Sequence, residues 1–483
     1  MLDQNDKLIN TGYQIALTKT EICNYEINDV VKASDIGLYI HPMFGEGSYH
    51  QPTFLEDPRV YEPHRRDKKY TLIPDGKGCV ARCTFCHRWD SGIRYIPVEK
   101  FMARLDELIA KHDVGFISPA TENFANDKRW LKEFCREIKK RDILWTAGAI
   151  RTKSVDPELI AMMKDAGCVS MSYGMETGSP SILEIMEKKT SLDDNKNAQK
   201  WTVEAGMTTV VQLVLGMPGE SPKTIRETID FVKYCFTLTP DLNPNNLSVN
   251  YAQALPGTPL YEYGRSNGLI GQNLEEEEQY LLDISDRNAH DEFTTLNFTD
   301  YPTLECQTWR PRITVEVNHA YVMKFGLDKY HELLLRDSNY FQPVEEDDGY
   351  HANPKRLLKT NKIEDANPTS DAMSEFSSGQ SEIPGLWSLI RQRKLGLAMI
   401  CHPISIYRFR WLLPVLVLYK NIQRFPPAYN IRLVLEYMSY KLFNVFMRRK
   451  WRFDFRSLRK IMIQDVGELS AVTPEMAPLR KGR

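Results

Sequence analysis

The sequence lacks the features of a membrane-spanning, secreted or disulfide-stabilised protein. No segment of its 483 residues offers the run of about 20 apolar residues that a membrane-spanning helix needs. The first residues, Met-Leu-Asp-Gln-Asn-Asp, have neither the basic start nor the apolar run of a signal peptide. Nine cysteines are too few and too scattered for a disulfide framework and indicate a reducing compartment. We therefore expect a cytoplasmic protein.

A strong charge excess is also missing from the chain as a whole. The formal net charge is −2, and the apolar and charged fractions are those of an ordinary globular protein. The length predicts more than one domain, at about 150 residues each. Charge is nevertheless uneven, because residues 391–460 hold 16 Lys or Arg against two acids, between apolar runs. This C-terminal region therefore differs in character from the rest.

Three of the nine cysteines stand close together. Cys79, Cys83 and Cys86 have C-x3-C-x2-C spacing, directly after a β-like run at residues 70–73. Three thiolates on one loop can hold three irons of a 4Fe–4S cluster, whereas an electron carrier supplies four. The open iron could then bind a small molecule, as a catalytic zinc site keeps an open position. The alternatives are three unrelated thiols or a zinc knuckle, for which the adjacent His87 has poor chelate geometry.

The other cysteines are isolated, and for them a buried structural role is expected. They are Cys23, Cys135, Cys168, Cys235, Cys306 and Cys401.

Strand and helix patterns alternate regularly around and after the cysteines. Strands are predicted at residues 70–73, 114–118, 143–149, 169–173, 208–215 and 247–254. Helices are predicted at residues 98–111, 127–140, 157–165, 180–187, 193–205 and 223–236. Repeated strand–helix units of about 30 residues predict a parallel sheet with right-handed crossovers. The expected fold class is α/β, as a partial (β/α)6 TIM-like barrel with its site at the C-terminal strand ends.

The cysteine motif resembles that of the radical SAM superfamily. In that family the open iron chelates S-adenosylmethionine (SAM), and an electron cleaves the sulfonium to give a 5′-deoxyadenosyl radical. The aromatic Phe85 just before the third cysteine adds to the match, and the resemblance implies that it contacts the cofactor. The resemblance covers about residues 69–270. It is closest to the branch that often carries a cobalamin-binding domain, with methyltransferases and anaerobic Mg-protoporphyrin cyclase-like proteins.

Two blocks that follow predicted strands extend the resemblance. Residues 121–127 (Thr-Glu-Asn-Phe-Ala-Asn-Asp) stand where this branch has Asp-Asp-x-Phe, so Glu122 or Asn123 would accept from the SAM ammonium. A helix N-cap at Asn126 is the alternative. Arg151, at the end of the third strand, could pair with a carboxylate through its forked guanidinium. The SAM carboxylate and Glu176 are candidates, and a surface arginine fits equally well.

Three further blocks follow the later strands. Residues 172–179 resemble the family's Gly-x-Glu-[Ser/Thr]-Gly block, which implies that Glu176 lies near the SAM ribose or amino group; a structural ion pair is the alternative. Gly216, Pro218 and Gly219 fall in a Gly-hydrophobic-Pro-Gly-Glu block, whose backbone could approach the adenine or simply make a tight turn. Residues 255–261 match a Pro-Gly-Thr-x-Leu-Tyr block.

The segment before the cysteines departs from the family pattern. Only 78 residues precede them, without the Asp-x-His-x-x-Gly loop that ligates cobalt in cobalamin-dependent members. A complete cobalamin domain does not fit, and cobalamin bound without one is the less favoured alternative.

Five parts are expected along the chain. They are an N-terminal extension (1–68), a radical SAM core (69–270), a core extension (271–342), an acidic and Ser-rich linker (343–385) and a basic amphipathic helical region (386–483). In the last part, a stripe at helical spacing is formed by Ile431, Leu435, Met438, Leu442 and Val445. The favoured interpretation is a helical cap packed on the barrel. Peripheral membrane contact through 386–460 is the alternative, and nucleic acid is disfavoured because its binding surfaces are more polar.

These observations predict a radical SAM enzyme that functionalises an unactivated C–H bond in a biosynthetic pathway, by methylation, cyclisation or a related step. The resemblance implies a small-molecule substrate and a flavodoxin or ferredoxin electron donor. A hydrophobic substrate is one alternative. Cys79, Cys83 and Cys86 would bind the cluster, and no residue is assigned as a catalytic acid or base. Transferase and oxidoreductase classes both stay open. The alternative function is a non-catalytic iron–sulfur redox sensor or scaffold.

Overall fold

The computed structural model describes residues 41–42, 57–65, 68–87, 92–119, 122–271, 273–285, 296–338, 383–392 and 394–447. Most of the predicted N-terminal extension, the predicted linker up to residue 382 and Cys23 lie outside the described residues. The predicted domain boundaries stay predictions.

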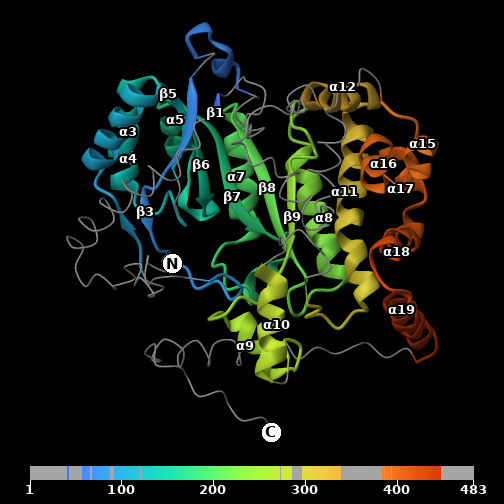
Figure 1. The fold of residues 1–483 in the computed structure, drawn as a ribbon. Coiled ribbons are helices and arrows are strands. Elements are labelled where there is room, and N and C mark those ends of the chain that lie inside the picture. The colour runs from blue at the N-terminus through green and yellow to red at the C-terminus, as the bar shows by residue number, and fades with distance from the viewer. Residues whose placement is uncertain are drawn as a thin grey trace.

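A curled seven-stranded sheet forms the centre of the fold (Figure 1). Its parallel strands are β2 (Lys69–Ile73), β5 (Val114–Pro119), β6 (Leu144–Ile150), β7 (Cys168–Glu176), β8 (Thr208–Leu215) and β9 (Leu247–Tyr251). The short β1 (His41–Pro42) pairs antiparallel with β2 at one edge. Spatial order follows chain order, so each parallel strand lies beside the next one along the chain. This arrangement confirms the predicted partial (β/α)6 barrel.

Helices connect the strands at the predicted places. They are α3 (Val98–His112), α4 (Lys128–Ile138), α5 (Pro157–Asp165), α6 (Pro180–Ile185), α7 (Leu192–Glu204) and α8 (Pro222–Phe236), with α9 (Pro259–Ser266) after the last strand. In α8, Ser221 caps the first turn and Pro222 fits its first position. The N-cap of α4 is Asp127, which accepts from the amides of Arg129 and Trp130, so the Asn126 alternative is wrong.

Two strands end three residues away from their predicted ends. β7 continues to Glu176, because its pairing with β8 resumes after a register shift next to Gly174. β9 ends at Tyr251, since the chain leaves the sheet after the Ala252 amide donates to the carbonyl of Leu215.

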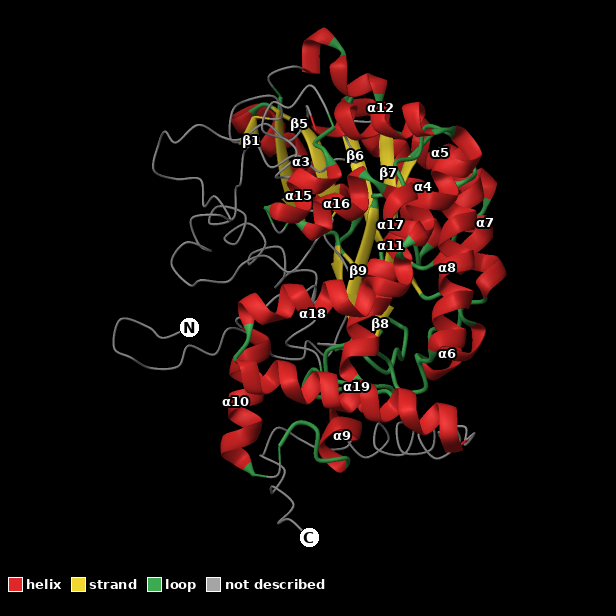
Figure 2. Ribbon diagram, turned by 90° about the vertical axis from the view of Figure 1, so that its right-hand side faces the viewer, coloured by secondary structure: helices red, strands yellow, loops and turns green. Residues whose placement is uncertain are grey.

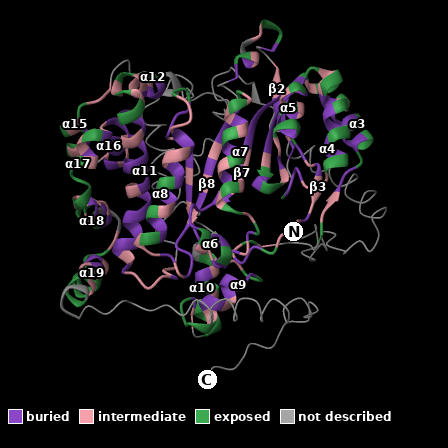
Figure 3. Cartoon of the chain, turned by 180° about the vertical axis from the view of Figure 1, so that it is seen from behind, coloured by how far each residue is buried: buried purple, intermediate pink, exposed green. Residues whose placement is uncertain are grey.

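The main core lies between the sheet and its helices, where most strand residues are buried (Figure 3). The outermost C-terminal helices are more exposed in the same view. Five of the six isolated cysteines are buried and unpaired, as predicted, and they are Cys135, Cys168, Cys235, Cys306 and Cys401.

The part of the chain after β9 is helical, as predicted. Its helices are α10 (Leu274–Ser285), α11 (Thr303–Phe325), α12 (Leu327–Ser338), α15 (Leu386–Arg391), α16 (Leu395–Cys401), α17 (Pro403–Arg408), α18 (Leu413–Arg424) and α19 (Pro427–Met447). α11 packs against α8, and α16 to α19 pack on α11 rather than on the sheet (Figures 1 and 2). No described helix combines the length and apolar character needed to cross a membrane.

The predicted apolar stripe of this region does not face the barrel. Ile431, Leu435 and Leu442 are more than half exposed, whereas Leu433 of the same helix is fully buried. The stripe has helical spacing, but the packed face of α19 is a different one. The favoured helical cap is therefore not held through this stripe.

Candidate functional site

The three clustered cysteines lie on one loop beyond the C-terminal end of β2. All three are free; Cys83 is buried, Cys79 is half-buried and Cys86 is exposed. The loop enters through Gly78, whose φ of +85° favours glycine. A Cβ there would also stand 2.5 Å from the carbonyl oxygen of Gly92. Glycine is thus required where the chain turns into the cysteine loop.

Two distant segments hold this loop in place. The Thr84 amide donates to the carbonyl of Met186 (3.1 Å), just after α6, and its carbonyl accepts from the amide of Leu260 (3.0 Å), in α9. His87, the residue after Cys86, hydrogen-bonds through its ring Nδ1 to the carbonyl of Pro256 (2.8 Å). Phe85, predicted to contact cofactor, is half-buried against an apolar cluster that includes Met217. The loop is therefore fixed by the turns after β7 and β9.

Nitrogen donors point at two of the sulfurs. The Asn123 side-chain amide donates to Cys79 Sγ at 3.6 Å, and the Ala81 backbone amide donates to the same atom at 3.4 Å. Arg151 donates to Cys83 Sγ at 3.9 Å. Asn123 and Arg151 come from the loops after β5 and β6, so the predicted site residues converge on the cysteine loop from neighbouring strand ends. Donors of this kind stabilise sulfur that carries negative charge.

A buried ion pair lies beside this group. Glu176, at the end of β7, pairs with Lys188 rather than with Arg151 among the described residues, and both partners are 8% exposed. Burial alone would lower the pKa of Lys188, but the Glu176 carboxylate and the Cys83 thiol outweigh it, so the pKa is raised. A Cβ at Gly174 would stand 2.6 Å from Glu176 Oε1 and 2.8 Å from Lys188 Nζ, which explains the glycine of this block.

Lys188 was missed by the sequence analysis, because it lies outside the recognised blocks. It sits on the turn between α6 and α7, flanked by Glu187 and Lys189 at positive φ. Its carbonyl accepts a hydrogen bond from Arg151. Burial raises the pKa of Cys83, while Lys188 and Arg151 act to lower it. Two cations, Lys188 and Arg151, therefore lie near Cys83, the most buried of the three clustered thiols.

The Gly216-Met217-Pro218-Gly219-Glu220 turn lies at the end of β8, the same edge of the sheet. Gly216 and Gly219 have φ of +83° and +81°, so the turn itself requires both glycines. Glu220 is 1% exposed and accepts from the Gly216 amide, while its Oε1 has no hydrogen-bond partner among the described residues. Burial raises the pKa of Glu220 to about 8, despite the hydrogen bonds from Gly216 and Met217. This carboxyl group is therefore held largely neutral below that pH.

Glu220 makes a testable contribution to the pH dependence of stability. An unfolded carboxyl titrates near 4.5 and the folded one near 8, so wild-type stability falls as pH rises through this window. Glu220→Gln mimics the neutral form and should not lose this stability. As the pH rises from 4.5 to 8, the free energy of unfolding of the variant is therefore expected to rise by about 2–4 kcal/mol relative to that of wild type. Urea unfolding at several pH values measures this stability difference, and Glu158→Gln, at an exposed position, is the control. Parallel pH profiles of stability for wild type and Glu220→Gln would contradict the prediction.

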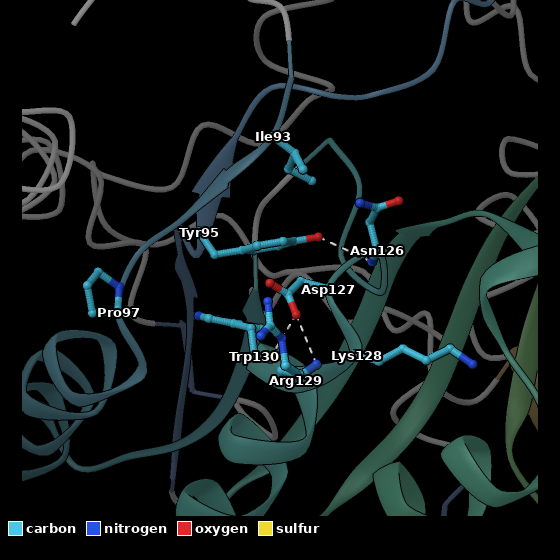
Figure 4. Close-up of a pocket in the computed structure, with 8 residues that line it drawn as sticks. All are labelled: Ile93, Tyr95, Pro97, Asn126, Asp127, Lys128, Arg129 and Trp130. Atoms are coloured by element: carbon cyan, nitrogen blue, oxygen red, sulfur yellow. Dashed lines mark hydrogen bonds between the residues drawn. The ribbon is translucent and has the colours of Figure 1, made fainter. Parts of the chain in front are cut away.

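A cavity of about 600 Å³ lies at the start of α4 (Figure 4). The Tyr95 ring on its wall stacks on Trp130, with centroids 4.8 Å apart. The Tyr95 hydroxyl donates to the carbonyl of Phe124 (3.1 Å), accepts from the amide of Asn126 (3.2 Å) and also bonds the carbonyl of Asn123. None of the predicted site residues lines this cavity. Tyr95, also missed by the sequence analysis, instead fixes the backbone that carries Asn123.

The donor set fits an iron–sulfur cluster. Three free thiols share one loop, with amide and guanidinium donors around them, and Glu122 is exposed. Among the described residues, no group of three or more His, Cys, Asp or Glu side chains converges on a single metal ion. An iron–sulfur cluster does not need its protein ligands to converge on one ion, because its thiolates bind different irons.

The hydrogen bond from Asn123 gives a second testable expectation. Donors to cluster sulfurs raise the reduction potential, so Asn123→Leu should lower the midpoint potential of a bound cluster, by a few tens of millivolts. The protein should stay folded, because Leu is of similar shape and removes an Asn123 oxygen that is buried without a partner among the described residues. A potentiometric titration followed by EPR measures the shift, with Asn126→Leu as control. An unchanged potential would show that the Asn123 amide does not act on Cys79.

Comparison with known proteins identifies the class of this domain. Residues 73–232 match the model of the radical SAM superfamily. The chain therefore contains a radical SAM domain, as predicted, and the matched residues begin at Ile73, the last residue of β2, and include the cysteine loop.

Particular relatives lie in the predicted branch. The chain is 29% identical over 203 residues to the anaerobic magnesium-protoporphyrin IX monomethyl ester cyclase of Rubrivivax gelatinosus, covering 39% of this chain and 35% of that protein. It is 26% identical over 215 residues to an uncharacterized methyltransferase of Pyrococcus horikoshii, covering 42% and 43%. The chain thus spans less than half the length of these relatives.

Among solved structures, one similar chain is the radical SAM methyltransferase TsrM of Kitasatospora setae, determined with cobalamin and a 4Fe–4S cluster bound. The identity is 19% and the TM-score 0.37, with 44% of this chain and 39% of that one covered.

Proposed function

We propose that this protein is a radical SAM enzyme that functionalises an unactivated C–H bond of a small molecule. The observation that carries the proposal is the C-x3-C-x2-C loop at the C-terminal end of β2, within the matched domain. Three cysteines and no fourth in this loop suit a cluster with one open iron. When bound, the cluster supplies the electron that cleaves SAM to methionine and a 5′-deoxyadenosyl radical.

The chain's own residues hold and orient these groups. Cys79, Cys83 and Cys86 bind three irons, and Asn123 and Arg151 stabilise two of the thiolates by hydrogen bonds. Other residues bind SAM at the same edge of the sheet, where they offer charged side chains and turn backbone. These are Glu122, the Glu176–Lys188 pair, and the Gly216, Pro218 and Gly219 turn. The radical needs a site closed to water and stray hydrogen donors.

The reaction is methylation, cyclisation or a related biosynthetic step, with flavodoxin or ferredoxin as electron donor. The cyclase and methyltransferase names among the relatives support this range and do not choose within it. Cobalamin is bound in the TsrM structure, and the expectation that this chain works without it remains a prediction.

A single assay tests the proposed function. The full chain is reconstituted anaerobically with iron and sulfide, reduced and given SAM, and 5′-deoxyadenosine and methionine are quantified. We expect both products in equal amounts, dependent on reductant, and a change in the EPR spectrum of the reduced cluster when SAM is added. Zinc in place of iron, or a cluster with four protein ligands and no SAM cleavage, would refute the proposal and favour a non-catalytic iron–sulfur protein.

A further inference from the structure

The exposed apolar side chains of the described residues concentrate in the C-terminal helices, and eight of them lie on α18 and α19. Of the 18 large apolar side chains that are exposed among the described residues, 12 fall between residues 387 and 443, and six are scattered over the rest. A monomeric protein rarely exposes such a concentration without a use for it. The most exposed on the two helices and the turn before them are Trp411, Val415, Ile422, Ile431, Leu435 and Leu442, each between 52% and 71% exposed.

These side chains form two stripes at helical spacing on neighbouring helices. Val415 and Ile422 are seven residues apart on α18, and Ile431, Leu435 and Leu442 follow on α19. The two helices lie side by side on the outer side of α11 (Figures 1 and 2). The surface is therefore two helices wide, which is broader than the seam that a single partner helix covers.

The opposite faces of the same helices are packed, so the outward orientation is fixed. Leu413 and Val417 of α18 are 2% and 7% exposed, and Leu433 of α19 is 0% exposed. Asn421 of α18 donates to Gln307 of α11 at 2.9 Å, which anchors the helix pair further. The exposed stripes are thus the second apolar face of helices that already have a core face.

The charges around this surface are almost all positive. Residues 404–443 contain six Lys or Arg and one acid, Glu436. That carboxylate accepts from the Thr303 backbone amide at 3.3 Å, at the start of α11. Arg408, Arg410 and Arg432 are exposed, and the Arg410 guanidinium lies 4.1 Å from the centre of the Tyr407 ring. Aliphatic stripes bordered by arginines and aromatic rings are typical of elements that lie in a membrane interface.

We propose that the outer face of α18 and α19, residues 404–443, docks this protein peripherally on an anionic lipid membrane. The basic border would attract acidic headgroups, while the apolar stripes insert to the level of the acyl boundary. A second copy of the chain fits less well, because two positive faces would repel each other. Nucleic acid fits less well because the surface is largely aliphatic. The proposal does not depend on the radical chemistry.

Vesicle flotation of the full chain tests this directly. We expect the protein to float with vesicles of phosphatidylcholine and phosphatidylglycerol, to float far less with phosphatidylcholine alone, and to lose binding at high salt. The triple variant Ile431→Ser, Leu435→Ser and Leu442→Ser should bind at least about tenfold more weakly. A matched control replaces three exposed apolar residues elsewhere by serine, namely Leu269, Leu282 and Met323, and should bind like wild type.

Three outcomes would overturn the proposal. Wild type could stay in the soluble fraction with anionic vesicles, or the triple variant could float as well as wild type although both melt at the same temperature. Light scattering could also show a wild-type dimer that the triple variant converts to monomer without any vesicle binding, which would make the face a contact between copies of the chain. A further variant, Arg408→Gln with Arg410→Gln and Arg432→Gln, should lose the preference for anionic vesicles if the proposal holds.

Discussion

Replacing any one of Cys79, Cys83 and Cys86 with alanine is expected to abolish 5′-deoxyadenosine formation. In the proposed cluster each thiolate would bind a different iron, so a single loss would leave the cluster with two protein ligands and two open irons. We expect such variants to retain little or no four-iron cluster after anaerobic reconstitution. Iron and sulfide content, the visible absorption spectrum and product formation measure the effect.

The structure supplies matched controls for the cysteine variants. Cys135 and Cys401 are also free, but they are buried in packed cores away from the loop. Cys401→Ala removes one sulfur from a core, costs stability by about 1–2 kcal/mol, and should leave cluster content and SAM cleavage unchanged. SAM cleavage at the wild-type rate in a Cys83→Ala variant would show that the predicted ligand set is wrong.

Replacing Lys188 with methionine is expected to destabilise the folded protein by about 3–5 kcal/mol. The change removes the ammonium group and leaves the Glu176 carboxylate buried at 8% exposure without its partner. Burial of an unpaired charge is far more costly than loss of a surface ion pair. Denaturant unfolding of the apoprotein at neutral pH measures this change without reference to activity.

Two further variants separate the pair from other effects of the substitution. The double variant Glu176→Gln with Lys188→Met removes both charges, so most of the lost stability should return. Lys111→Met breaks the exposed pair with Glu107, whose atoms are 2.5 Å apart, and should change stability by less than about 0.5 kcal/mol. Equal losses for Lys188→Met and Lys111→Met would mean that the Glu176–Lys188 pair is solvated in solution.

The sequence predicts the barrel well because its helices are amphipathic and its strands are short apolar runs between turn residues. Helix α8 illustrates this: Ile225, Ile229, Val232 and Phe236 recur at helical spacing, and all four are at most 1% exposed. Burial along one helix face is a local property, so the sequence carries it directly.

Contacts between distant segments could be predicted only in part. The cysteines and the blocks at the strand ends stand out in the sequence, whereas Lys188 reaches the site through a turn with two residues at positive φ. Gly178 is a second example of a contact that the sequence does not show, since the sequence indicated only a place in a ligand block. A Cβ at this position would stand 2.4 Å from the Cβ of Phe231, so the packing of α8 alone already requires glycine.

The orientation of α19 could not be derived from its spacing. Apolar residues occupy both the stripe at Ile431 and Leu435 and the opposite face at Leu433. Periodicity defines a helix with apolar faces, and only the tertiary contacts decide which of them is covered.

The way the cysteine loop is held has a consequence for the biogenesis of the protein. The Thr84 hydroxyl bonds the carbonyl of Ile185, 101 residues away, and His87 bonds the carbonyl of Pro256, 169 residues away. During translation the three thiols leave the ribosome long before either support has been synthesised. Iron and sulfide would then meet a loop without its final shape, so metal loading should follow, rather than guide, the closing of the polypeptide around it.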